Sequence, residues 1–131
     1  MNYFEKVKNY LLDLGYEISI ENNDDQIFVI NNEEKGICNM ALDCEGDVLI
    51  MEQHVLDFDH VNLDSLKRIL QINRELIHGA FVLDESGNKM IFRDTLALEN
   101  LDQNELDSSF TALTIALVEH ADEFMTLASK K

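Results

Sequence analysis

The segment from Ile69 to Leu98, ILQINRELIHGAFVLDESGNKMIFRDTLAL, decides the fold of this chain. It begins in an amphipathic helix that carries Asn73 and then passes Gly79. Beyond Gly79, two short apolar strands flank the turn residues Ser86-Gly87-Asn88. Glycine, asparagine and serine between apolar runs are typical of a hairpin turn. The segment therefore predicts a helix followed by a β-hairpin.

The rest of the chain adds a strand meander before this segment and a helix at each end. Apolar spacing predicts helices over residues 3–14, 63–78 and from Asp102 onward. Predicted strands cover residues 16–20, 27–30, 36–43, 48–55, 79–84 and 89–94. Because parallel crossovers need about a dozen residues or more, strands joined by such short turns are antiparallel. We expect one α+β domain over residues 1–131, with a largely antiparallel sheet and three helices in the order helix, strand meander, helix, hairpin, helix.

Charge and composition restrict the classes of partner. The formal net charge is −16, and no basic residue occurs between Gly36 and Leu66 or between Asp94 and Ser129. Such a surface repels nucleic acids and anionic membranes and favours basic partners. We find neither a signal-peptide pattern nor an apolar run of about 18 residues. We therefore expect a cytoplasmic protein without membrane insertion, in which Cys38 and Cys44 are reduced thiols.

The predicted second helix has two apolar stripes. Leu63, Leu66, Leu70 and Ile77 form one stripe, and Ile69, Ile72 and Leu76 form the other beside it. This breadth favours one face against the helix's own sheet and one against a second subunit, although cover by the chain's own loops would also explain it. Asn73 lies on the apolar side, where it either ties the helix to neighbouring backbone or sets the register of a dimer. The dimer-interface candidates are Leu66, Ile69, Ile72, Asn73 and Leu76.

No catalytic motif is visible. The five glycines form neither GxGxxG nor a P-loop, and no serine lies in GxSxG. The segment from His54 to His60 is the one cluster of possible metal ligands, and it also has the pattern of a polar loop before a capped helix. We expect a protein that is not an enzyme and has no catalytic residue, no cofactor and no tightly bound metal.

The order helix, meander, Asn73-bearing helix, Gly79-Ala80-Phe81-Val82-Leu83-Asp84 strand, hairpin and long acidic last helix resembles a known family. It is similar to the CesT-like class I chaperones of type III secretion and to their YbjN-like relatives. The resemblance is sharpest from Leu66 to Phe124. It implies a non-enzymatic homodimer that holds an extended segment of a secreted effector or other client on apolar patches of the first helix and the sheet.

The resemblance points to client-binding residues in the first part of the chain. The candidates are Tyr3, Phe4, Val7, Ile18, Ile20, Phe28 and Ile30. The alternative for each is a place in the core, and this is the favoured alternative for Val7, Phe28 and Ile30. A second function is also compatible with the resemblance, namely a small YbjN-like regulatory or stress-related protein of the same fold without a secretion client.

Overall fold

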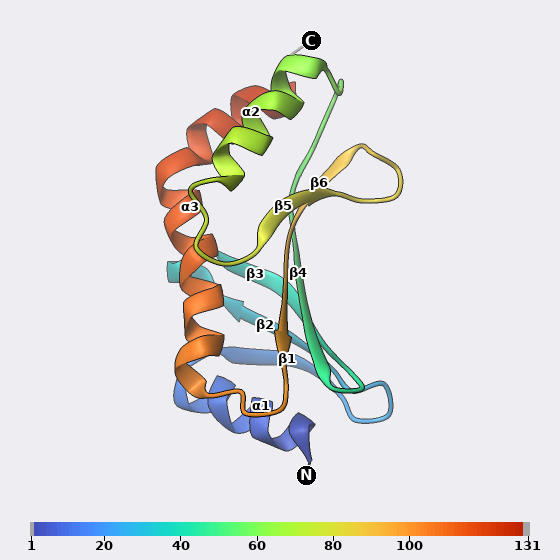
Figure 1. Cartoon of the computed structure of the whole chain (residues 1–131), viewed down its shortest axis with the longest axis vertical. Coiled ribbons are helices and arrows are strands. Elements are labelled where there is room, and N and C mark those ends of the chain that lie inside the picture. Colours follow the sequence, from blue (N-terminus) through green and yellow to red (C-terminus); the bar gives the residue numbers. More distant parts are fainter. Residues whose placement is uncertain (1, 130–131) are drawn as a thin grey trace.

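The computed structural model describes residues 2–129, over which three α-helices accompany a six-stranded antiparallel sheet (Figure 1). The helices are α1 (Tyr3–Asp13), α2 (Leu63–Asn73) and α3 (Gln103–Ser129), and η1 (Glu33–Lys35) is a short 3₁₀ turn. The strands are β1 (Glu17–Asn22), β2 (Ile27–Asn32), β3 (Ile37–Glu45), β4 (Val48–Asp57), β5 (Ala80–Leu83) and β6 (Lys89–Ala97). The predicted α+β class and element order are confirmed.

The strand order in the sheet is β1-β2-β3-β4-β6-β5, and each neighbouring pair is antiparallel. The first four strands form a meander, as their short turns require. The chain then leaves the sheet for α2 and returns as β5, whose one partner in the described part of the chain is β6. Strands β1 and β5 therefore form the two edges of the sheet, and α2 lies beside β5 at the end of the molecule opposite α1 (Figure 1).

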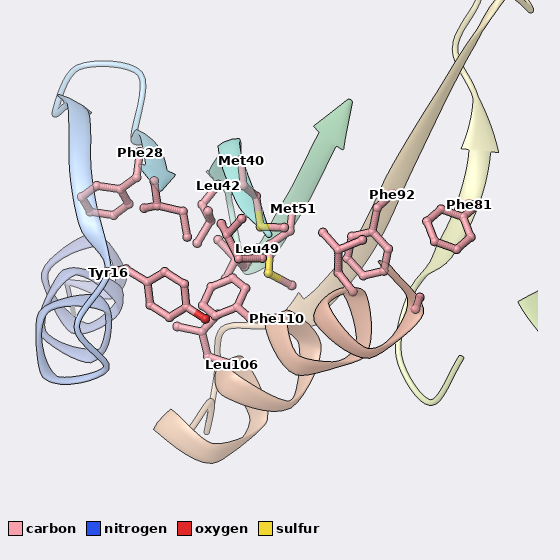
Figure 2. Close-up of a cluster of buried hydrophobic side chains, with 14 of the residues drawn as sticks. Tyr16, Phe28, Met40, Leu42, Leu49, Met51, Phe81, Phe92, Leu106 and Phe110 are labelled. Carbon is pink, nitrogen blue, oxygen red and sulfur yellow. The ribbon is translucent and has the colours of Figure 1, made fainter. Parts of the chain in front are cut away.

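The hydrophobic core lies between the sheet and the helices α1 and α3 (Figure 2). Phe4 of α1 stacks on Phe28 of β2 with ring centroids 4.0 Å apart, and Tyr16 packs against Phe110 of α3 at 4.7 Å. Alternate residues of the central strands, among them Met40, Leu42, Leu49, Met51 and Phe92, complete the layer. One face of the sheet is thus buried, and the three helices gather on that side.

Side-chain caps begin α2 and α3. The Oδ1 atom of Asn62 accepts a hydrogen bond from the Ser65 N–H at 2.9 Å, and that of Asp102 accepts one from the Glu105 N–H at 2.7 Å. Each bond satisfies a donor that the first helical turn leaves free. No helix among residues 2–129 is long and apolar enough to cross a membrane.

The second helix ends at Asn73, whereas the sequence predicted a helix as far as residue 78. The N–H groups of Arg74, Glu75 and Leu76 donate to carbonyls three residues earlier, which tightens the last turn. The Asn73 side chain meanwhile pairs with the main chain of Phe81. Apolar periodicity continues to Ile77, but these local bonds turn the chain toward β5.

Candidate protein-binding surfaces

Four of the seven predicted client-binding residues belong to the core. Phe4, Val7, Phe28 and Ile30 are at most 1% exposed. The Phe28 ring of β2 stacks on Phe4 of α1, and Ile30 of the same strand lies in the same core cluster. The core alternative that was favoured for Val7, Phe28 and Ile30 is therefore the observed one, and the client-binding alternative for Phe4 is corrected in the same way.

The other three candidates surround the edge strand β1. Tyr3 and Ile18 are half-buried and pack against the rim of the core. Ile20 is 54% exposed and pairs with Val29, across a register shift from Ile18. Because of this shift at Ser19, Ile18 lies on the helix side of the sheet and Ile20 on the opposite side. Apolar side chains thus flank both faces of the edge.

Within residues 2–129, strand β1 has a neighbour on one side only, so one row of its main-chain hydrogen-bonding groups faces away from the sheet. Its exposed side chains include Glu17 and Glu21, and Lys8 of α1 lies 3.1 Å from the Glu21 carboxylate. An extended segment could add to this edge through main-chain hydrogen bonds while its side chains contact the flanking apolar groups.

The sheet face turned away from the helices was not among the predicted sites. The strand registers place a set of half-buried apolar side chains on it. They are Ile27, Val29, Ala41, Val48, Ile50, Val82 and Ile91. Their alternation with the core residues was visible in the sequence, but only the register shows that they share one face with Ile20.

The same outer face carries acidic groups. Asp43 lies beside Ile27 and Ile50 in the strand registers. Burial raises the pKa of the Asp43 carboxyl, and a hydrogen bond with Glu45 raises it further. The Glu52 carboxylate pairs with Arg93 at 2.9 Å. The outer face therefore combines apolar area with negative charge, which favours a partner that is both apolar and basic.

Two of the predicted dimer-interface residues are buried inside the chain itself. Ile69 is 5% exposed and Ile72 is fully buried. Asn73 accepts a hydrogen bond from the Phe81 N–H at 2.8 Å and donates one to the Phe81 carbonyl at 3.1 Å. The first alternative for Asn73 is therefore the observed one, since its amide ties α2 to β5. Ile69 and Ile72 therefore belong to the core, and the Asn73 amide is already hydrogen-bonded within the chain.

The other apolar stripe of α2 faces outward. Leu63, Leu70 and Ile77 are exposed, Leu70 at 67%. Half-buried Leu66 lies in a groove between α2 and β5, whose lining also includes Leu70 and Leu83. Leu76 is half-buried against the core and faces α3 instead. One apolar stripe of the second helix is therefore covered within the chain, and the other is largely exposed.

In the segment from His54 to His60, the residues up to Asp57 are the end of β4, and the chain bends at Asp59 and His60. The Asp57 carboxylate lies 2.7 Å from Lys89 Nζ and 2.9 Å from His54 Nε2. The hydrogen bond from Lys89 lowers the Asp57 pKa, with a second contribution from His54. The Lys89 ammonium group thus pairs with the Asp57 carboxylate, and among residues 2–129 no three possible metal ligands from this segment come together.

The two thiols show no catalytic arrangement among the described residues. Both are free, Cys38 exposed and Cys44 half-buried. Burial, together with the charge of Asp43, raises the pKa of Cys44 to about 11, so this thiol stays protonated at neutral pH. A protonated thiol is a poor nucleophile.

Residues 1–130 match the CesT_Tir_1 family, and the chain belongs to that family. No curated protein sequence matches it. The family assignment agrees with the resemblance that the sequence of Leu66 to Phe124 indicated, and with the chaperone-like arrangement of sheet and helices.

Solved structures confirm the fold at low sequence identity. YbjN from E. coli, described as a candidate transcription regulator, superposes with a TM-score of 0.71 at 13% identity, over 92% of each chain. A chain of the HopA1–SchA chaperone–effector complex gives 0.62 at 12%, over 88% of this chain and 91% of that one. The Yersinia pestis type III secretion chaperone SycH, solved with a fragment of YscM2, gives 0.60 at 18%, over 96% and 99%.

Proposed function

We propose that this protein is a non-catalytic, dimeric binding protein that holds an extended segment of a client protein. The observation that carries the proposal is the edge strand β1, which is open on one side and has exposed or half-exposed apolar residues on both faces. Family membership supports the same class of protein. Chaperone–effector complexes among the structural neighbours show that this fold accommodates a protein partner in those cases.

The client is an extended segment with apolar and basic side chains. Strand addition would satisfy the unpaired main-chain groups of β1, and alternate client side chains would contact Tyr3 and Ile18 on one face and Ile20 on the other. Glu17 and Glu21 on the same strand would disfavour an acidic segment. Apolar burial supplies most of the affinity, while charge raises the association rate and makes it depend on salt.

The test compares Ile20→Asp with the parent chain. Proteins captured from the native cytosol by the parent chain are identified, and their binding segment is synthesised as a labelled peptide. Fluorescence polarisation should then show at least tenfold weaker peptide binding to Ile20→Asp. The exposed position of Ile20 means that the substitution leaves the core intact.

The matched control is Val118→Asp, which places the same charge on an exposed apolar position of α3. It should bind the peptide as the parent chain does. Equal affinity for Ile20→Asp and the parent chain would refute client binding at β1.

A second function has a structural observation in its favour. YbjN superposes with a higher TM-score than either chaperone described above, 0.71 against 0.62 and 0.60. A small regulatory or stress-related protein without a secretion client would share the fold and the dimer. Failure of the parent chain to retain any extended peptide would favour this function over the first.

A further inference from the structure

A histidine at the seam between α2 and α3 lies among carboxylates from both segments. The His120 side chain on α3 is 11% exposed, and its Nε2 atom lies 2.8 Å from Glu75 Oε2 and 3.8 Å from Glu119 Oε2. Glu75 belongs to the turn that follows α2, where its N–H donates to the Ile72 carbonyl at 2.9 Å. One donor atom from each of the three side chains lies within 4.8 Å of the other two.

The other ring nitrogen of His120 faces a fixed carboxylate. Its Nδ1 atom is 3.5 Å from Glu123 Oε1. Arg68 of α2 holds this carboxylate with two hydrogen bonds, of 2.5 Å from Nε and 3.0 Å from Nη2. Metal-binding histidines almost always donate their second N–H to a carboxylate, carbonyl or water. The Glu123 carboxylate, held by Arg68, lies near the second ring nitrogen, where such a partner belongs.

We propose that Glu75, Glu119 and His120 form a binding site for a divalent transition-metal ion of the zinc type. The imidazole distinguishes this set from an ordinary acidic surface, because Mg²⁺ and Ca²⁺ take oxygen ligands whereas imidazole suits zinc. Zinc binds nitrogen and carboxylate oxygen at about 2.0–2.2 Å, which places donor atoms of a tetrahedral site roughly 3.3–3.5 Å apart. The observed separations of 2.8 and 3.8 Å lie on either side of that range.

Small side-chain movements would bring the donor atoms to the separations that a tetrahedral zinc site needs. The Glu75 and Glu119 side chains are 56% and 55% exposed, so both carboxylates can shift without disturbing the core. His120 would bind through Nε2, and water would fill the fourth position. The bound ion would join the end of α2 to α3, so its binding should raise the melting temperature by mass action.

The site is distinct from the proposed client edge. Its ligands come from α3 and from the segment after α2, whereas the client edge is formed by β1 and α1. Zinc binding and peptide capture can therefore fail independently. Sequence reasoning missed this cluster because Glu75 and His120 are 45 positions apart.

The test titrates ZnCl₂ into the chelator-treated full chain by isothermal calorimetry and follows the melting temperature. We expect one zinc ion per chain with micromolar affinity and a melting temperature several degrees higher in zinc. Glu119→Gln should weaken binding at least tenfold and His120→Gln should abolish it. If His120→Gln fails to fold, the exposed Glu119→Gln variant still decides the outcome.

Two controls address binding by unrelated groups. Glu105→Gln removes an exposed carboxylate near the start of α3, about 20 Å from the site along the helix, and His54→Ala removes an exposed imidazole. Both should bind zinc as the parent chain does. The proposal is overturned by no calorimetric or thermal response at 1 mM zinc, by equal affinity in Glu119→Gln, or by an equal thermal response to MgCl₂.

Discussion

At the scale of single residues, Asn73 joins two elements that the sequence only places in succession. Its amide makes both hydrogen bonds with the main chain of buried Phe81. Asn73→Ala should lower the free energy of unfolding by about 1–3 kcal/mol, because it leaves the Phe81 N–H and carbonyl without partners. Urea unfolding measures the change. Gln71→Ala, at an exposed position of the same helix, should change stability by less than about 0.5 kcal/mol.

Unlike the Asn73 amide, the buried hydroxyl of Tyr16 has no hydrogen-bond partner among the described residues. Burial, with the charge of Asp107, raises its pKa to about 12. The folded state thus favours the neutral phenol. The stability that the neutral Tyr16 phenol gives the folded state is complete below pH 10, and it is lost as the pH rises toward 12.

Tyr16→Phe tests both properties. At pH 7 it should leave stability unchanged or slightly raise it, since no hydrogen bond is lost. Between pH 10 and 12 the parent chain should lose stability more steeply than the variant in thermal melts. The absorbance titration of tyrosinate should also lose its most alkaline component in the variant. A substantial loss of stability at pH 7 would show that the hydroxyl has a partner.

At the scale of elements, the turn from α2 to β5 depends on Gly79. Its φ angle is +73°, and a Cβ atom there would lie 2.6 Å from Phe92 Cζ. Gly79→Ala should cost at least about 2 kcal/mol from the left-handed backbone and the clash. Gly87→Ala is the matched control, since it has a φ angle of +76° but open space around it. Denaturant melts should show a larger loss for Gly79→Ala; equal losses would mean that Phe92 moves aside.

At the scale of the whole molecule, the exposed stripe of α2 and the groove beside β5 favour a second copy of this chain as their cover. Leu70→Asp should shift the mass measured by light scattering from two chains toward one, because an unpaired charge in an apolar contact is costly. Leu70 is the informative position, since Ile69→Asp would disrupt the core instead. Gln71→Asp should leave the mass unchanged. A single-chain mass for the parent protein at high micromolar concentration would contradict the dimer.

Local patterns in the sequence determined the element order, the antiparallel pairing and the two apolar stripes of the second helix. Short turns, side-chain caps and apolar periodicity act over a few residues, so a single sequence displays them. The family resemblance followed from the same local features, because they are packing motifs.

Only the tertiary structure decided which apolar residues are covered. It buried Phe4 on Phe28, turned Ile69 and Ile72 inward, left Leu70 exposed, and gathered Ile20 with the outer face of the sheet. It also brought Glu75 to His120 and ended α2 at Asn73. These outcomes depend on strand register and on contacts between residues far apart in the chain. Hydrophobic periodicity shows that a side chain is apolar, whereas the packed elements determine what covers it.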